Sequence, residues 1–145
     1  MITVRTATAM TASIAELCGA DHGNDPDRIA HWTANKTVDG VRSMLANPNS
    51  RLFVAEIDGS IAAVGSITGD SEIGLNYVDP AYRFQGASKA LLAAMENDMR
   101  ARGIREAKLS ATTTARRFYL DAGWEDTGSP EAGRFIVDQP MRKRL

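Results

Sequence analysis

The segment Arg83–Lys89 is the clearest candidate for a binding site in this chain. A predicted strand ends at Val78, and a long predicted helix begins near Gly86. The first N–H groups of a helix have no partner inside it, and the helix dipole places partial positive charge beside them. Gly86 allows an anion close to the main chain, and Arg83 and Lys89 add positive charge. The segment is therefore either a cradle for a diphosphate or an ordinary turn between a strand and a helix.

The spacing around Gly86 differs from two common nucleotide-binding motifs. It matches neither GxxxxGK[ST] nor GxGxxG, so neither ATP nor a dinucleotide is the expected ligand. Charge gives a second indication: residues 1–70 carry 5 basic and 8 acidic side chains, whereas residues 71–145 carry 12 and 10. This asymmetry either arises by chance or indicates an anionic ligand in the second half and a cationic one facing the first.

Tyr119 is the candidate catalytic acid. Ala115, Phe118 and Ala122 share one face of a predicted helix, and Tyr119 lies one step round that helix. A phenol, whose ordinary pKa is near 10, can donate a proton to a leaving thiolate whose thiol has a pKa of about 8.5. The alternative is a half-buried amphipathic ring in the core.

The elements that must position these residues follow from hydrophobic periodicity and turn signals. Three consecutive antiparallel strands, two of them joined by an Asp58-Gly59 hairpin, lead into the long helix, and a parallel strand follows it. Predicted strands cover residues 2–5, 51–57, 60–68, 72–78, 107–111 and 134–137, and predicted helices cover residues 11–20, 26–45, 86–102 and 115–122. Asp25 is the expected N-cap of the helix that begins at Pro26.

The two candidate segments together resemble the GCN5-related N-acetyltransferases (GNAT family). The family signature [Q/R]-x-x-G-x-[G/A] matches Arg83-Phe-Gln-Gly-Ala87, with Ser88 in the last position. The later pattern A-x-x-F-Y-x-x-x-G-[F/W] matches residues 115–124. The resemblance implies a single domain over residues 1–145 of the α/β (α+β) class. Its sheet would be mixed and mostly antiparallel, flanked by helices, with the parallel fourth and fifth strands splayed apart.

The resemblance also implies an activity: acetyl-CoA-dependent transfer of an acetyl group to a primary amine of a small molecule or peptide. The amine would attack directly in a ternary complex, a backbone N–H would polarise the thioester carbonyl, and Tyr119 would protonate the departing sulfur. The pantetheine arm would pair with the strand before the cradle, and the diphosphate would sit in the cradle. The implied cofactor-binding residues are Tyr77, Val78, Arg83, Phe84, Gln85, Gly86, Ala87, Ser88, Lys89 and Thr112.

Three residues depart from the family pattern. Phe84 stands where glycine is usual, Ser88 replaces glycine or alanine, and Thr112 stands where asparagine often occurs. Phe84 is the most awkward because a bulky residue takes a positive φ only at a cost. These departures, and the lack of an obvious base, leave a rival hypothesis open: a non-catalytic acyl-CoA-binding sensor or partner-binding module with the same fold.

The base that deprotonates the amine has several candidates. Glu72, on the strand that leads to the cradle, is either a base acting through water or a solvated carboxylate at a strand end. His22 and His31, in the region that borders the acceptor pocket by family analogy, are either bases or surface residues. Cys18 is either a nucleophile for a covalent acetyl-enzyme or, because it lies on an apolar helical face, an inert buried thiol.

Composition sets the remaining expectations. The chain has 145 residues, 43% hydrophobic and 24% charged, which suits one folded domain. Its single cysteine excludes an internal disulfide and favours a reducing, cytoplasmic location. The net charge of −1 gives no reason to expect nucleic-acid binding, and no apolar run is long enough to predict a membrane span. No metal is expected, a homodimer through the last strand is plausible by analogy, and residues 142–144 either contact the 3′-phosphate of CoA or form a solvated chain end.

Overall fold

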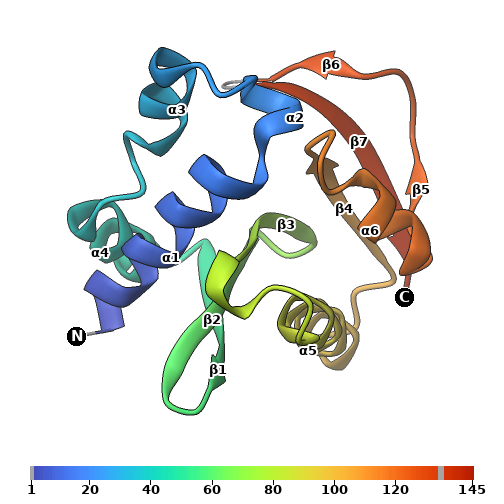
Figure 1. Ribbon diagram of the computed structural model, residues 1–145. Coiled ribbons are helices and arrows are strands. Elements are labelled where there is room, and N and C mark those ends of the chain that lie inside the picture. Colours follow the sequence, from blue (N-terminus) through green and yellow to red (C-terminus); the bar gives the residue numbers. More distant parts are fainter. Residues whose placement is uncertain (1, 134–135) are drawn as a thin grey trace.

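A mixed seven-stranded sheet with helices on both faces forms the computed structural model, which describes residues 2–133 and 136–145 (Figure 1). The helices are α1 (Ile2–Leu17), α2 (Gly19–His22), α3 (Pro26–Thr33), α4 (Val38–Ala46), α5 (Ala87–Ala101) and α6 (Arg116–Asp121), with a 3₁₀ turn at Pro80–Tyr82. The strands are β1 (Ser50–Ile57), β2 (Ser60–Thr68), β3 (Glu72–Val78), β4 (Glu106–Ala111), β5 (Glu125–Asp126), β6 (Glu131–Ala132) and β7 (Val137–Arg144).

The predicted order of three antiparallel strands, a crossover helix and a parallel strand is confirmed. Strands β1, β2 and β3 pair antiparallel, and β3 pairs parallel with β4 after the chain crosses over through α5. Asp58 and Gly59 both have positive φ, of 50° and 80°, as a tight hairpin between β1 and β2 requires. Asp25 caps α3 as expected, because its side chain accepts a hydrogen bond from the Asp27 N–H at 3.0 Å.

The expected strand over residues 2–5 is wrong, because these residues form the start of α1. The side of α1 that faces the protein carries Thr6, Met10, Ser13 and Ile14, all nearly inaccessible to solvent. Two of these residues are polar, so the helical stripe is weak in a hydrophobicity pattern. Since no strand precedes α1 among the described residues, the parallel pair consists of the third and fourth strands of the chain rather than the fourth and fifth.

The end of the chain also differs from expectation. Strand β7 lies inside the sheet, between β4 and β5. Residues 142–144, expected as a solvated end or a phosphate contact, are part of β7, where Lys143 lies opposite Ala107. The predicted strand over residues 134–137 overlaps β7 only at Val137, and residues 134–135 lie outside the described part of the chain.

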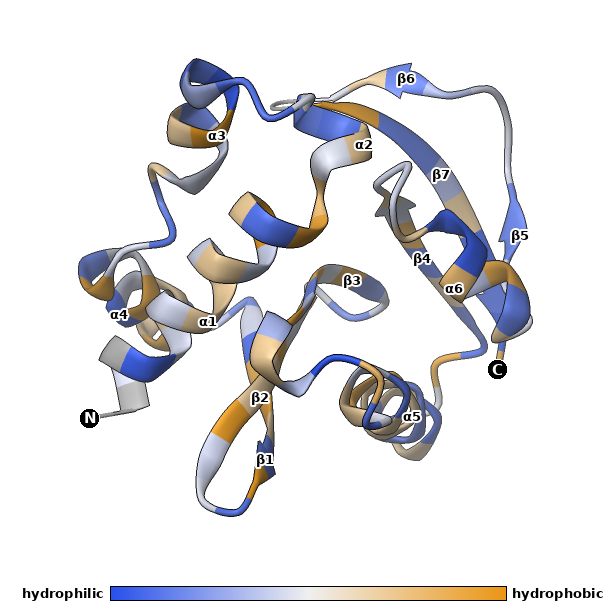
Figure 2. Ribbon diagram, in the orientation of Figure 1, coloured by the Kyte–Doolittle hydropathy of each residue, from blue (hydrophilic) through white to orange (hydrophobic). Residues whose placement is uncertain are grey.

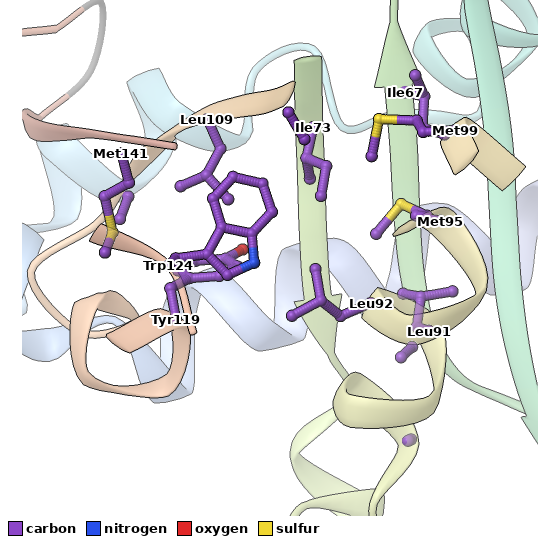
Figure 3. Close-up of a cluster of buried hydrophobic side chains, with 14 of the residues drawn as sticks. Ile67, Ile73, Leu91, Leu92, Met95, Met99, Leu109, Tyr119, Trp124 and Met141 are labelled. Atoms are coloured by element: carbon purple, nitrogen blue, oxygen red, sulfur yellow. The ribbon is translucent and has the colours of Figure 1, made fainter. Parts of the chain in front are cut away.

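The core lies on both faces of β2, whose residues Ile61–Ile67 are all buried. On one face, α5 contributes Leu91, Leu92, Met95 and Met99, which Figure 3 shows on one side of β3 with Tyr119 and Trp124 on the other. On the opposite face, α1 and α4 cover Ile61 and Val64. Figure 2 shows apolar and polar residues interspersed along the helices, as expected for helices that cover a sheet. None of the helices in the described residues is long and apolar enough to cross a membrane.

A buried ionic contact links α5 to β7. The carboxylate of Glu96 on α5, only 4% exposed, accepts a hydrogen bond from Lys143 Nζ at 2.6 Å and another from Trp124 Nε1 at 3.4 Å. Lys143 Nζ also donates to the carbonyl oxygen of Ala122, at the end of α6, at 2.7 Å. This contact therefore ties α5, β7 and the C-terminal end of α6 together.

Candidate active site

A cavity of about 390 Å³ lies where β3 and β4 separate. The two strands pair at only two positions, Glu72 with Lys108 and Ile73 with Leu109. The next residue of β3, Gly74, forms a bulge, since Ile73 and Leu75 lie opposite consecutive residues of β2. Beyond the bulge the cavity takes the place of further strand pairing, and its walls come from both strands, from the starts of α5 and α6, and from α1.

The start of α5 forms one end of this cavity. Gly86 has a φ of +80°, and a Cβ at this position would meet nothing within 4 Å, so backbone conformation rather than space calls for glycine. The N–H of Ala90 makes the first hydrogen bond of the helix, to the Gly86 oxygen at 3.0 Å. The N–H groups of residues 87–89 precede it and have no acceptor within the helix. These residues line the cavity together with Arg83, an arrangement suited to a diphosphate.

Phe84, which stands where glycine is usual in the family, adopts a positive φ. Its φ is +65°, and its side chain is 88% exposed at the cavity rim. The guanidinium carbon of Arg83 lies 4.5 Å from the centre of the Phe84 ring, which is a cation–π contact. At an exposed site such a contact contributes about 0.5–1 kcal/mol, against about 1–2 kcal/mol for the left-handed backbone.

Tyr119 lies in the wall of the same cavity, at the α6 side. The side chain is only 5% exposed, and its ring packs edge-on against Trp124 with centroids 5.9 Å apart. Asn76 Nδ2 donates a hydrogen bond to the Tyr119 hydroxyl oxygen at 3.2 Å. Burial raises the pKa of Tyr119 to about 12, although the Asn76 hydrogen bond lowers it somewhat. The phenol therefore keeps its proton at neutral pH and can act as an acid.

The peptide groups of β3 give the cavity a row of hydrogen-bonding sites. The N–H of Asp79 donates to the Ala62 oxygen beside β2 at 2.7 Å. Because successive peptide groups of a strand point in opposite directions, those of Asn76 and Val78 point away from β2 and towards the cavity. An N–H in this position can hold a developing negative charge on a carbonyl oxygen.

Comparison with known proteins identifies the family. The sequence model of the acetyltransferase (GNAT) domain matches residues 20–145. The chain belongs to the GNAT acetyltransferase family. A comparison with the curated proteins finds no match.

Solved structures of GNAT acetyltransferases share this fold. A GCN5-related N-acetyltransferase from Rhodopseudomonas palustris, also described as a class II aminotransferase, is 22% identical with a TM-score of 0.86, over 99% of this chain and 89% of that one. The PaiA N-acetyltransferase from Thermoplasma acidophilum, in complex with coenzyme A, is 17% identical with a TM-score of 0.75, over 98% and 94%. An aminoglycoside 6′-N-acetyltransferase complexed with coenzyme A is 14% identical with a TM-score of 0.69, over 99% and 90%.

Most of the predicted cofactor residues of this GNAT acetyltransferase meet at the cavity, namely Tyr77, Val78, Arg83, Phe84, Gly86, Ala87, Ser88, Lys89 and Thr112. Gln85 is exposed and is not part of the lining. Thr112 is engaged locally, because its hydroxyl oxygen accepts a hydrogen bond from the Ala115 N–H at 3.0 Å. The same loop is held from outside by Asp21, whose carboxylate accepts from the N–H groups of Thr113 and Thr114 at 2.7 and 3.1 Å.

The candidate bases do not line this cavity. Glu72 lies at the paired end of β3, outside the lining. His22 is buried rather than on the surface: its Nε2 lies 2.6 Å from the Ile14 oxygen, and its Nδ1 accepts from the Asn24 N–H at 3.0 Å. His31 is exposed on α3. None of the described residues that line the cavity is Asp, Glu or His.

Cys18 does line the cavity, although its side chain is only 6% exposed. Burial, together with the charge of Asp21, raises the pKa of its thiol to about 12. A thiol in this state is a poor nucleophile at neutral pH, which favours the inert role over a covalent acetyl-enzyme. Among the described residues, no group of His, Cys, Asp and Glu side chains is arranged to hold a metal ion.

Asn76 and the part of the wall that comes from α1 were not predicted from the sequence. Ser13, Leu17 and Cys18 of α1 line the cavity, and nothing in their spacing indicates a site. Asn76 can be noticed in the sequence, since it is a polar amide between Leu75 and Tyr77 in a strand whose other residues after Glu72 are apolar or aromatic. Asparagine is depleted in strands, so its presence there calls for a partner or a role.

Proposed function

We propose that this GNAT domain is an N-acetyltransferase that transfers the acetyl group of acetyl-CoA to a primary amine of a small molecule or peptide by direct attack in a ternary complex. The observation that carries the proposal is that the start of α5, whose first N–H groups suit an anion, and a buried tyrosine with an elevated pKa line the same cavity. Two of the solved structures with this fold are complexes with coenzyme A, which supports the choice of cofactor.

The residues of this chain fit acetyl-CoA from one end of the cavity to the other. The N–H groups at the start of α5, with Arg83 and Lys89, would hold the diphosphate. The peptide groups of Asn76 and Val78 would pair with the amides of the pantetheine arm and hold the thioester carbonyl oxygen. The bound molecule supplies the acetyl group as a thioester, whose sulfur would then lie beside Tyr119.

The transfer forms a C–N bond and breaks a C–S bond. The amine nitrogen attacks the thioester carbon, and Tyr119 gives its phenolic proton to the departing sulfur. The proton that the nitrogen loses leaves to solvent, which returns a proton to Tyr119. Since the described lining contains no carboxylate or imidazole, we assign no base role to Glu72, and the amine would react in its neutral form.

Calorimetry and a thiol-release assay test this proposal. We expect CoA and acetyl-CoA to bind, and an amine panel with acetyl-CoA to release free thiol. We also expect Tyr119→Phe to lower kcat by about 10²-fold or more while leaving CoA affinity within a few fold. A chain that binds neither CoA nor acetyl-CoA at millimolar concentration would refute the proposal.

The sensor alternative predicts a different result in the same assay. The strained, exposed Phe84 and the absence of a base from the described lining favour it. A sensor would bind acetyl-CoA but release no thiol with any amine. A cytoplasmic location and a homodimer stay predictions, which localisation in the source cell and sedimentation would test.

A further inference from the structure

Asn76, a residue of the cavity wall, has a buried side-chain oxygen that the described protein atoms do not satisfy. Its side chain lies in the wall next to Tyr119, and its Nδ2 donates to the Tyr119 hydroxyl oxygen at 3.2 Å. Its Oδ1 is buried and has no hydrogen-bond partner among the described residues. An unsatisfied buried acceptor costs about 1–3 kcal/mol. Such a group in a cavity wall therefore points to an N–H or O–H that a ligand supplies.

The direction of the Asn76–Tyr119 hydrogen bond decides where the phenolic proton goes. An amide nitrogen can only donate, so in this contact the Tyr119 oxygen is the acceptor. The phenol must direct its own proton elsewhere. Because the ring is enclosed by Trp124 and Phe118 while its edge lines the cavity, the free direction is into the cavity. The contact with Asn76 thus leaves the phenolic proton of Tyr119 available to a group in the cavity.

We propose that Asn76 is a positioning residue for the transfer, an inference that rests on the proposed function. Its Nδ2 fixes the Tyr119 hydroxyl so that the proton faces the leaving sulfur, and its Oδ1 accepts a hydrogen bond from an N–H group bound beside that sulfur. This N–H belongs either to the amine, which attacks the carbon bonded to the sulfur, or to the nearer amide of the pantetheine arm, which lies a few bonds from the sulfur. In the first case Asn76 would also orient the nucleophile.

A double-mutant cycle tests the first half of the inference. Asn76→Asp keeps the size of the side chain but replaces the donor by an acceptor, so Tyr119 would donate its proton to residue 76. We expect kcat to fall by about 10²-fold, as for Tyr119→Phe, while in the Tyr119→Phe background the same change costs less than about threefold. The exposed Asn97→Asp, which makes the same chemical change on α5, is the matched control and keeps wild-type kcat. If Asn76→Asp lowers kcat by the same factor in the Tyr119→Phe background as in the wild type, the inference is wrong, because an added charge alone would act in both backgrounds.

The Asn76→Leu variant tests the second half and separates the two N–H sources. A weaker affinity for CoA in calorimetry, by about 5- to 20-fold, assigns Oδ1 to the pantetheine amide. An unchanged CoA affinity with a KM for the amine raised by the same factor assigns it to the nucleophile. If neither changes in a variant that melts like the wild type, Oδ1 has no ligand partner and this half is wrong. If wild type releases thiol and Tyr119→Phe is impaired but Asn76→Asp is not, only the inference fails; if wild type releases no thiol, the proposed function fails.

Discussion

Removing the charge of Lys143 is expected to destabilise the whole domain, because it leaves the buried Glu96 without its closest partner. The change Lys143→Met keeps the length and apolar stem of the side chain and deletes the ammonium group. Glu96 is 4% exposed, and its other contacts, with Trp124 Nε1 at 3.4 Å and Arg100 at 3.5 Å, are longer than the 2.6 Å to Lys143. Breaking a buried ion pair costs about 3–5 kcal/mol. Because two donors remain, we expect a loss of about 3 kcal/mol in the free energy of unfolding.

This loss translates into a thermal shift that is easy to measure. With an entropy of unfolding of about 2.1 cal/mol/K per residue, a chain of 145 residues has about 0.3 kcal/mol/K, so the Tm should fall by about 10 °C. Circular dichroism melts and urea titrations give the two numbers independently. Arg117→Met is the control, because its ion pair with Asp121 is exposed on both sides and should matter by less than about 0.5 kcal/mol.

A double variant checks the reasoning. In Glu96→Met with Lys143→Met, no charge is left without a partner inside the protein, so most of the lost stability should return. A single Lys143→Met variant that loses under 1 kcal/mol would show that the contact is effectively solvated. A double variant no more stable than the single one would show that packing, rather than the uncompensated charge, causes the loss.

Four further predictions concern three residues of the cavity wall. Phe84→Gly should be more stable than Phe84→Ala by about 1 kcal/mol in urea titrations, because both lose the contact with Arg83 but only glycine relieves the positive φ; equal stability would contradict the strain. Cys18, whose pKa burial raises to about 12, should resist iodoacetamide at pH 8 in the folded protein and react once urea unfolds it, so rapid labelling of the native state would argue against the buried thiol. Tyr119, with its pKa raised to about 12 by burial, should stay protonated from pH 7 to 10, so kcat should not decline there through loss of this acid. The pKa of Tyr119 in the folded protein lies above its unfolded value near 10, so the stability that this residue contributes is complete below pH 10 and is lost as the pH rises through 12. In thermal melts from pH 9 to 12, Tyr119→Phe should lessen this decline.

The sequence predicted the middle of the fold, residues 51–122, well because its signals there are local. The Asp58-Gly59 turn, the apolar stripe of α5 and the positive-φ glycine before it each lie within a few residues of the element they specify. The prediction for the start of the chain was wrong because the interactions that decide its structure are not local. The face of α1 is buried by contacts with β2, β3, α3 and α4, and it uses threonine and serine as well as Met10 and Ile14. Tertiary packing therefore overrode the β-branched residues of the first turn.

The candidate site also has residues that could be predicted from the sequence and residues that could not. The cradle residues and Tyr119 could be found because each belongs to a motif on one helix start or one helix face. Asn76 could not be connected with Tyr119, since 43 positions separate them and only the folded chain brings β3 and α6 together. Glu72 looked suitable because it shares a strand with the cavity wall, but the bulge and the strand pairing place it at the closed end.

The two-position pairing of β3 and β4 has a consequence for how the sheet responds to a ligand. Past those positions the sheet consists of two halves, β1–β2–β3 and β4–β7–β5, each of which turns a row of peptide groups towards the other across the cavity. These inner edges resemble the outer edges of a sheet, whose unpaired N–H and C=O groups can bind an extended chain. A bound molecule with amide groups of its own would act as a substitute strand and stiffen the halves into one body. The backbone amides along both inner edges would then take up deuterium more slowly.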